Sequence, residues 1–184
     1  MQTYPQKGDV TMRYTILAGL MILAAAFSRL LPHPANVAPI TAMALAGGVY
    51  LDKRFALVIP LAALLITDWF IGYYPILFFV YGSFIAIGLI GLWLKSHKRP
   101  FPVLGATLFS SLLFFVVTNF GVWIMGPEMY PKTWGGLVEC FVAAIPFFRN
   151  TVLGDLVYTG VLFGIFELIT YLARNSAETQ QQSI

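Results

Sequence analysis

The sequence predicts an all-α membrane protein, a single bundle of about six transmembrane helices. Of its 184 residues, 59% are hydrophobic and only 10% are charged, whereas a soluble domain has about 25% charged residues. The apolar residues also gather in successive windows of roughly 20, the length that crosses the hydrocarbon core of a bilayer. A soluble core of this length could not bury so much apolar surface, so we expect the lipid bilayer to surround most of the chain.

The first three windows follow one another closely. Residues 14–31 form an apolar window that stops at Pro32-His33-Pro34, because proline cannot continue a helix. Residues 37–51 are short and rich in alanine and glycine, and Asp52-Lys53-Arg54 separates them from residues 55–72. Basic residues precede the first window, as in a signal peptide. Its apolar character nevertheless continues long enough to span a membrane, so we expect a retained helix.

The remaining windows are longer. A tight aromatic turn leads to residues 76–94, and a basic loop leads to residues 103–125. The last window covers residues 150–172. The short loops leave no room for a second domain, so we expect residues 1–172 to form one transmembrane domain. Residues 173–184 are polar, and we expect a disordered cytoplasmic tail there.

Residues 137–148 form an apolar stretch that is short for a span. Arg149 and Asn150 separate it from the last window. It could lie at the membrane interface, re-enter the membrane, or form a seventh span. A seventh span would move only one basic residue, the C-terminal Arg174, to the other face of the membrane. The distribution of basic residues therefore distinguishes the alternatives only weakly. We expect six spans and an interfacial helix over residues 137–148.

The basic residues indicate the orientation. With six spans, one face of the membrane receives eight of the eleven: Lys7, Arg13, Lys53, Arg54, Lys95, Lys98, Arg99 and Arg174. Because cytoplasmic loops carry an excess of Lys and Arg, we expect a multi-pass protein of the cytoplasmic (inner) membrane of a bacterium, with both termini in the cytoplasm. The formal net charge of +3 is small and dispersed, so no nucleic-acid partner is expected.

In this topology the polar residues of the spans lie mostly on the outer side. Counting from the nearest helix end at 1.5 Å per residue, Asp68 lies roughly 6 Å deep, Asp155 about 9 Å and Asn119 about 10 Å. An ionised side chain in hydrocarbon costs about 2.5–3.5 kcal/mol, so each aspartate needs a partner. Arg29 and Arg149 are the nearest cations in this topology.

Two interpretations of this outer polar layer remain open. Asp–Arg pairs could simply hold helices together, or the layer could form a solute site. The same layer is rich in aromatic residues: Trp69, Tyr73, Tyr74, Trp123, Tyr130, Trp134 and Tyr158. Although such residues also form belts at membrane interfaces, a mixed aromatic and polar cup is typical of a small-molecule site. We therefore favour a solute pocket.

Catalytic and metal-binding motifs are missing from the sequence. The single cysteine, Cys140, excludes an internal disulfide, and the two histidines, His33 and His97, lie in different loops. No phosphate-binding loop, nucleophile elbow or metalloprotease motif occurs. We therefore expect no cofactor, no metal and no catalytic residues. Energy from nucleotide hydrolysis would have to come from a partner, an energising ATPase module.

Several stretches resemble an uncharacterised family of small bacterial membrane proteins. They are Arg29–Ile40 with Ala42–Leu45, Thr118–Trp123, Tyr130–Thr133, and Ile145–Thr151 with Gly154-Asp155. The layout is more distantly similar to the S components of energy-coupling-factor vitamin transporters, which are six-helix proteins that bind vitamins near the outer surface. Thr67-Asp68-Trp69 carries that similarity. The Ala-x-x-x-Ala motif by which S components contact their energising partner is absent from the inner ends of the first and third windows.

These observations together predict the binding and import of a small organic solute, a vitamin or nutrient precursor. The residues expected to contact the solute or close over it are Asp68, Asn119, Trp123, Arg149, Asn150, Asp155, Arg29, His33 and Asn36, the last two in a loop that acts as a lid. Two alternatives remain. One is an intramembrane enzyme that uses Asp68 and Asp155 as paired carboxylates. The other is a non-catalytic assembly or accessory subunit in which the polar layer is purely structural.

Overall fold

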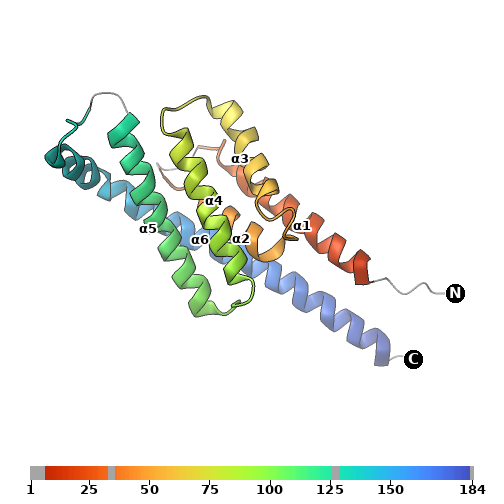
Figure 1. Ribbon diagram of the computed structural model, residues 1–184. Coiled ribbons are helices and arrows are strands. Elements are labelled where there is room, and N and C mark those ends of the chain that lie inside the picture. Colours follow the sequence, from red (N-terminus) through yellow and green to blue (C-terminus); the bar gives the residue numbers. More distant parts are fainter. Residues whose placement is uncertain (1–6, 33–35, 126–128, 183–184) are drawn as a thin grey trace.

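The computed structural model describes residues 7–32, 36–125 and 129–182, with side chains for residues 16–172 within these ranges. The described chain is all-helical. Its helices are α1 (Lys7–Ser28), α2 (Ile40–Tyr50), α3 (Val58–Ile71), α4 (Leu77–Leu94), α5 (Pro100–Met125) and α6 (Trp134–Gln182). Figure 1 shows that α1 begins and α6 ends at the same end of the molecule.

Three of these helices are long and apolar enough to cross a membrane. They are α4, α5 and the Trp134–Leu172 part of α6. Helix α1 has 22 residues, of which the apolar part Ile16–Ser28 is described with side chains. Helices α2 and α3 are shorter, with 11 and 14 residues. At 1.5 Å per residue these two extend only about 16 and 21 Å, less than the roughly 30 Å of a hydrocarbon core. Among the described residues, the all-helical chain thus has three candidate membrane spans, and the six spans predicted from the sequence are not confirmed.

The short helix α2 lies at the centre of the bundle. Every residue from Thr41 to Val49 is buried, and α2 contacts each of the other five helices. Its small residues permit this position. A Cβ atom on Gly48 would lie 2.5 Å from the backbone of Gly91, and one on Gly91 would lie 2.6 Å from the carbonyl oxygen of Leu45. The backbones of α2 and α4 thus touch directly, and α2 packs against protein along its length.

The longest helix, α6, departs from the sequence prediction. Residues 137–148 and 150–172, expected to be an interfacial helix and a separate span, belong to one continuous helix with Pro146 inside it. A proline removes one backbone hydrogen bond, and membrane helices tolerate that loss. The tail expected to be disordered is also helical, as far as Gln182. Its alanine, glutamate and glutamine residues favour a helix, which explains the extension.

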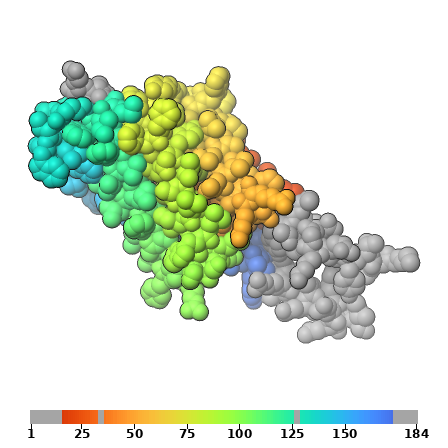
Figure 2. Space-filling view, viewed as in Figure 1, coloured from red at the N-terminus to blue at the C-terminus, as the bar shows by residue number. Residues whose placement is uncertain are grey.

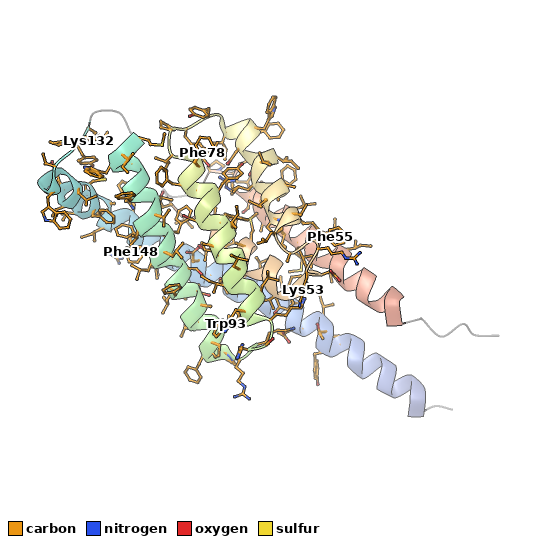
Figure 3. The ribbon with its side chains drawn as sticks, in the orientation of Figure 1. Lys53, Phe55, Phe78, Trp93, Lys132 and Phe148 are labelled. Atoms are coloured by element: carbon orange, nitrogen blue, oxygen red, sulfur yellow. The ribbon has the colours of Figure 1, made fainter. Side chains whose placement is uncertain are left out.

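The two ends of the bundle differ in what they carry. In Figure 3, Phe78 and Lys132 lie at one end, and Lys53 and Trp93 lie at the other. We name the first the polar end, because α1, α3 and α5 finish there beside the polar residues described below. Figure 2 shows α4 and α5 side by side on one face of the bundle, and their outward-facing apolar side chains are extensively exposed. Such a surface suits a lipid environment.

Candidate functional site

A cavity of about 370 Å³ lies near the polar end, and we call it the polar cavity. Helices α2 to α6 and the segments that follow α1 and α3 all contribute to it. Its lining residues are Arg29, Asn36, Ala38, Ile40, Thr41, Ile71, Tyr74, Ile76, Val80, Phe114, Thr118, Asn119, Val122, Thr151 and Asp155. Seven of these fifteen residues, Ala38 among them, have apolar side chains. The lining therefore combines an apolar part with a polar part.

Arg29 reaches the cavity wall from the turn that ends α1. Its guanidinium forms an ion pair with Asp68 on α3, with 2.9 Å between Nη2 and Oδ1, and donates from Nη1 to the hydroxyl of Thr67 at 2.6 Å. The two charged side chains are only 8% and 5% exposed. Opposite charges this close neutralise each other. Asp68 thus has an arginine partner, as the sequence predicted.

Tyr74 completes this ion-pair cluster. Helix α3 ends at Gly72, whose φ of 96° is readily adopted only by glycine, and the chain then turns back. The turn brings the Tyr74 hydroxyl to Asp68, where it donates to Oδ2 at 2.9 Å. Burial, followed by the hydrogen bond and charge of Asp68, raises the pKa of Tyr74. The phenol therefore remains a donor at neutral pH, and Asp68 accepts bonds on both carboxylate oxygens.

Asp155 on α6 has a different environment. It is 1% exposed, and its Oδ2 accepts a 2.6 Å hydrogen bond from Ser111 on α5. The side chain of Thr41 on α2 also hydrogen-bonds to it. Gly154 makes this approach possible, since a Cβ atom there would lie 3.2 Å from the backbone of Val37 just before α2. Among the described side chains, Asp155 forms no ion pair with a lysine or arginine.

Further hydroxyl groups of α5 and α6 line the same cavity as this carboxylate. Thr118 donates to the carbonyl of Phe114 at 2.6 Å, and Thr151 donates to that of Phe147 at 3.1 Å. Because each hydroxyl proton points back along its own helix, the oxygen lone pairs are the groups presented to the cavity. The wall around Asp155 is therefore rich in acceptors.

A second hollow, of about 270 Å³, lies at the opposite end of the bundle. Tyr50, Lys98 and Glu167 are among its lining residues, and the Tyr50 hydroxyl donates to Glu167 at 3.0 Å. Lys98 lies over the Tyr50 ring. Tyr50, Lys98 and Glu167 thus have partners close by. Among the described residues that line the two hollows, the buried carboxylate without a cation belongs to the polar cavity.

One family model matches residues 9–179, a range that contains every residue lining the polar cavity. The chain belongs to that family. It is a family of unknown function (DUF6580), which confirms the resemblance to an uncharacterised family. No curated protein and no solved structure matches the chain.

Four of the site residues predicted from the sequence line the polar cavity of this DUF6580 member. They are Arg29, Asn36, Asn119 and Asp155. Asn36 has a left-handed backbone (φ 62°), a conformation that asparagine adopts more readily than most residues. The Asn119 amide donates to the carbonyl of Phe115 at 2.7 Å. Four of the nine residues predicted from the sequence therefore lie in the wall of one cavity.

The other predicted site residues lie elsewhere. Asp68 is outside the lining and reaches the cavity only through Arg29 and Tyr74. Trp123 lies outside it and donates from its indole to the Pro131 carbonyl at 3.0 Å. His33, expected in a lid, lies outside the described residues. Asn150 is also absent from the lining.

The expected partner of Asp155 was Arg149, and the structure does not pair them. Arg149 is exposed and outside the cavity lining. Because they are six residues apart on one helix, the two side chains point about 120° apart around the helix axis at 100° per residue. The depth of Asp155 also differs from expectation. Its partner Ser111 is 14 residues from the end of α5 at Met125, or about 21 Å, so Asp155 lies near the middle of the bundle.

The sequence analysis missed the hydroxyl groups that contact Asp155. The sequence analysis looked for a cation as the partner of Asp155 and singled out neither Ser111 nor Thr41. One signal was available: Thr107, Ser111 and Thr118 recur at spacings of four and seven residues, and all three are buried. These spacings place them on one face of α5, where a polar stripe on an otherwise apolar helix indicates a polar partner.

Proposed function

We propose that the polar cavity binds a small organic solute of the size of a vitamin or nutrient precursor, and that the chain serves in the import of that solute. The observation that carries the proposal is a buried carboxylate, Asp155, in the wall of a 370 Å³ cavity. Ligand pockets typically measure about 300–1,000 Å³. An ionisable residue inside a membrane bundle is costly and is usually kept for a function.

The positions of the carboxylates favour solute binding over catalysis by a carboxylate pair. General acid–base chemistry with two carboxylates requires both to reach the reacting group. Asp155 lines the cavity, whereas Asp68 is held by Arg29 and Tyr74 behind the wall. A single carboxylate surrounded by hydroxyl groups suits recognition of a bound molecule.

The proposal is tested by ligand-induced thermal shift of the full chain in detergent, screened over vitamins and their precursors. A ligand at about 100 times its Kd stabilises a protein by about 2.7 kcal/mol. For a chain of this size we expect that to raise Tm on the order of 5–10 °C. The shift should disappear in Asp155→Asn and persist in Asp52→Asn, the same change at an exposed loop position. If no compound shifts Tm, the polar layer is structural and the accessory-subunit interpretation holds.

Import further requires the polar end to face the outside of the cell. We propose this orientation because it leaves most basic residues in the cytoplasm. Single cysteines are introduced in a Cys140→Ser background, at Tyr73, which is 79% exposed, and at the exposed His97 of the opposite end. An impermeant thiol reagent applied to intact cells should label position 73 and not position 97. Labelling of position 97 alone would reverse the orientation and exclude uptake through this end.

A further inference from the structure

We infer that the solute carries a cationic group, such as a protonated amine or amidine, and that this group binds at Asp155. The inference rests on the proposed function and concerns the same cavity. It follows from three features of the wall: its charge, its hydrogen-bonding character and the position of its apolar part.

The charge of the wall is unbalanced. Its charged residues are Arg29 and Asp155. The charge of Arg29 is neutralised by Asp68 at 2.9 Å, and both of its terminal nitrogens already donate to α3. Among the described side chains, the donors to Asp155 are the neutral hydroxyls of Ser111 and Thr41, and no lysine or arginine pairs with it. With Asp155 ionised, these three groups leave one negative charge in the cavity wall. A cation bound there would neutralise it.

The hydrogen-bonding character agrees with the charge. A carboxylate has about four acceptor positions on its two oxygens. The hydroxyls of Ser111 and Thr41 occupy two of them, so acceptor positions remain for a ligand. Thr118 and Thr151 donate to their own helices, so their lone pairs face the cavity. A wall of acceptors matches the several N–H donors of an ammonium or amidinium group and would repel another anion.

The size and the apolar part of the cavity indicate an organic cation. A water molecule occupies about 30 Å³, so a cavity of about 370 Å³ is far larger than a bare inorganic ion needs. Phe114, Ile76 and Val80 provide apolar surface in the same lining. We therefore expect a molecule with an apolar or aromatic body and one cationic end.

The experiment uses a matched set of probes on the full chain in detergent, in phosphate buffer that contains no amine. The probes are 2-phenylethylamine, its neutral analogue 2-phenylethanol and the anion 3-phenylpropionate, and the measurement is Kd by calorimetry. A charge-assisted hydrogen bond is stronger than a neutral one, so the amine should bind on the order of 10- to 100-fold more tightly than the alcohol. The anion should bind no more tightly than the alcohol.

Two variants locate the effect. In Asp155→Asn the preference for the amine should fall to about threefold or less, because the amide keeps the size and removes the charge. Asp52→Asn, the matched change in the exposed loop, should keep the full preference. If Asp155→Asn does not fold, the probe series on the wild-type chain decides alone, since it needs no variant.

Several results would overturn the inference, and they are distinct from failure of the proposed function. The inference falls if the alcohol or the anion binds as tightly as the amine, or if folded Asp155→Asn keeps the preference. It also falls if NaCl, and not KCl, stabilises the wild-type chain and this effect needs Asp155, because the carboxylate would then belong to an inorganic cation. If the vitamin screen yields only neutral or anionic ligands, solute binding stands and the cation inference fails. If neither the screen nor the probes bind, both fail.

Discussion

Two buried aspartates on apolar helices have opposite surroundings in this bundle. Asp68 on α3 is 6% exposed and has a cation and a phenol as partners. Asp155 on α6 is 1% exposed, and its partners among the described residues are hydroxyl groups. Asp68 lies behind the cavity wall and Asp155 is part of it. Burial alone therefore does not identify a functional carboxylate in a membrane bundle. The two aspartates differ instead in their partners and in the adjoining cavity.

The largest effect on stability is expected at Asp68. Asp68→Asn removes the charge that balances Arg29, whose side chain is only 8% exposed. Leaving one member of a buried pair uncompensated costs about 3–5 kcal/mol, which we expect to appear as a lower free energy of unfolding in detergent. The double variant Arg29→Met/Asp68→Leu should recover most of the loss, since an apolar pair can replace a buried ion pair. If the free energy of unfolding of Asp68→Asn equals that of the wild-type chain, the ion pair does not hold these helices together.

A smaller loss is expected at the contact that holds the central helix. Gly91→Ala places a methyl group 2.6 Å from the carbonyl of Leu45, so α2 and α4 must move apart. Overpacking of this kind costs about 1–3 kcal/mol. It should also weaken solute binding, because α2 carries Thr41 to Asp155.

The matched control for this change is Gly82→Ala, on the same helix. A Cβ atom at Gly82 meets nothing within 4 Å, so the methyl group should be tolerated or slightly stabilising. Equal melting temperatures for the Gly91→Ala and Gly82→Ala variants would contradict the direct packing of α2 on α4.

At Asp155 we expect a small change in stability and a large change in binding. Asn accepts one hydrogen bond at its oxygen, and the hydroxyls of Ser111 and Thr41 can rotate to accept from its nitrogen. No charged partner is left alone, so the free energy of unfolding of Asp155→Asn should change by less than about 1 kcal/mol. Solute binding should be lost. If this variant unfolds as readily as Asp68→Asn, both aspartates are structural and the comparison between them fails.

The smallest effect is expected at Arg149. This residue is exposed and outside the cavity lining, so Arg149→Gln should change the free energy of unfolding by no more than about 0.5 kcal/mol. The Kd for the solute should also be unchanged, as calorimetry can show. A loss of binding in this variant would mean that the guanidinium of Arg149 contacts the solute. The cavity would then extend further along α6.

The sequence was sufficient to predict α4 and α5 and insufficient to predict the continuity of α6 or the arrangement of the helices. Residues 76–94 and 103–125 correspond closely to α4 and α5 because each is an uninterrupted apolar window. Hydropathy cannot distinguish an apolar residue that faces lipid from one that faces protein. The central position of α2 follows from small-residue contacts such as Gly48 with Gly91, which involve residues far apart in the sequence.

The candidate site was predictable in part for similar reasons. Arg29 and Asp68 fall at matching depths near helix ends that are easily located, and the ion pair follows. The depth of Asp155 was counted from Arg149 as a helix start, and α6 has no break there. Its contact with Ser111 depends on how α5 and α6 are placed against each other, which depth along a single helix does not fix.

Native mass spectrometry of the chain extracted from its own membrane tests the central claim most directly, because it asks whether Asp155 holds a small molecule. The wild-type chain and Asp52→Asn should each carry a bound organic molecule small enough for a cavity of about 370 Å³. Asp155→Asn, folded and prepared identically, should carry none. A wild-type chain without a bound molecule, or the same molecule retained by Asp155→Asn, would contradict the assignment of Asp155 to a solute site.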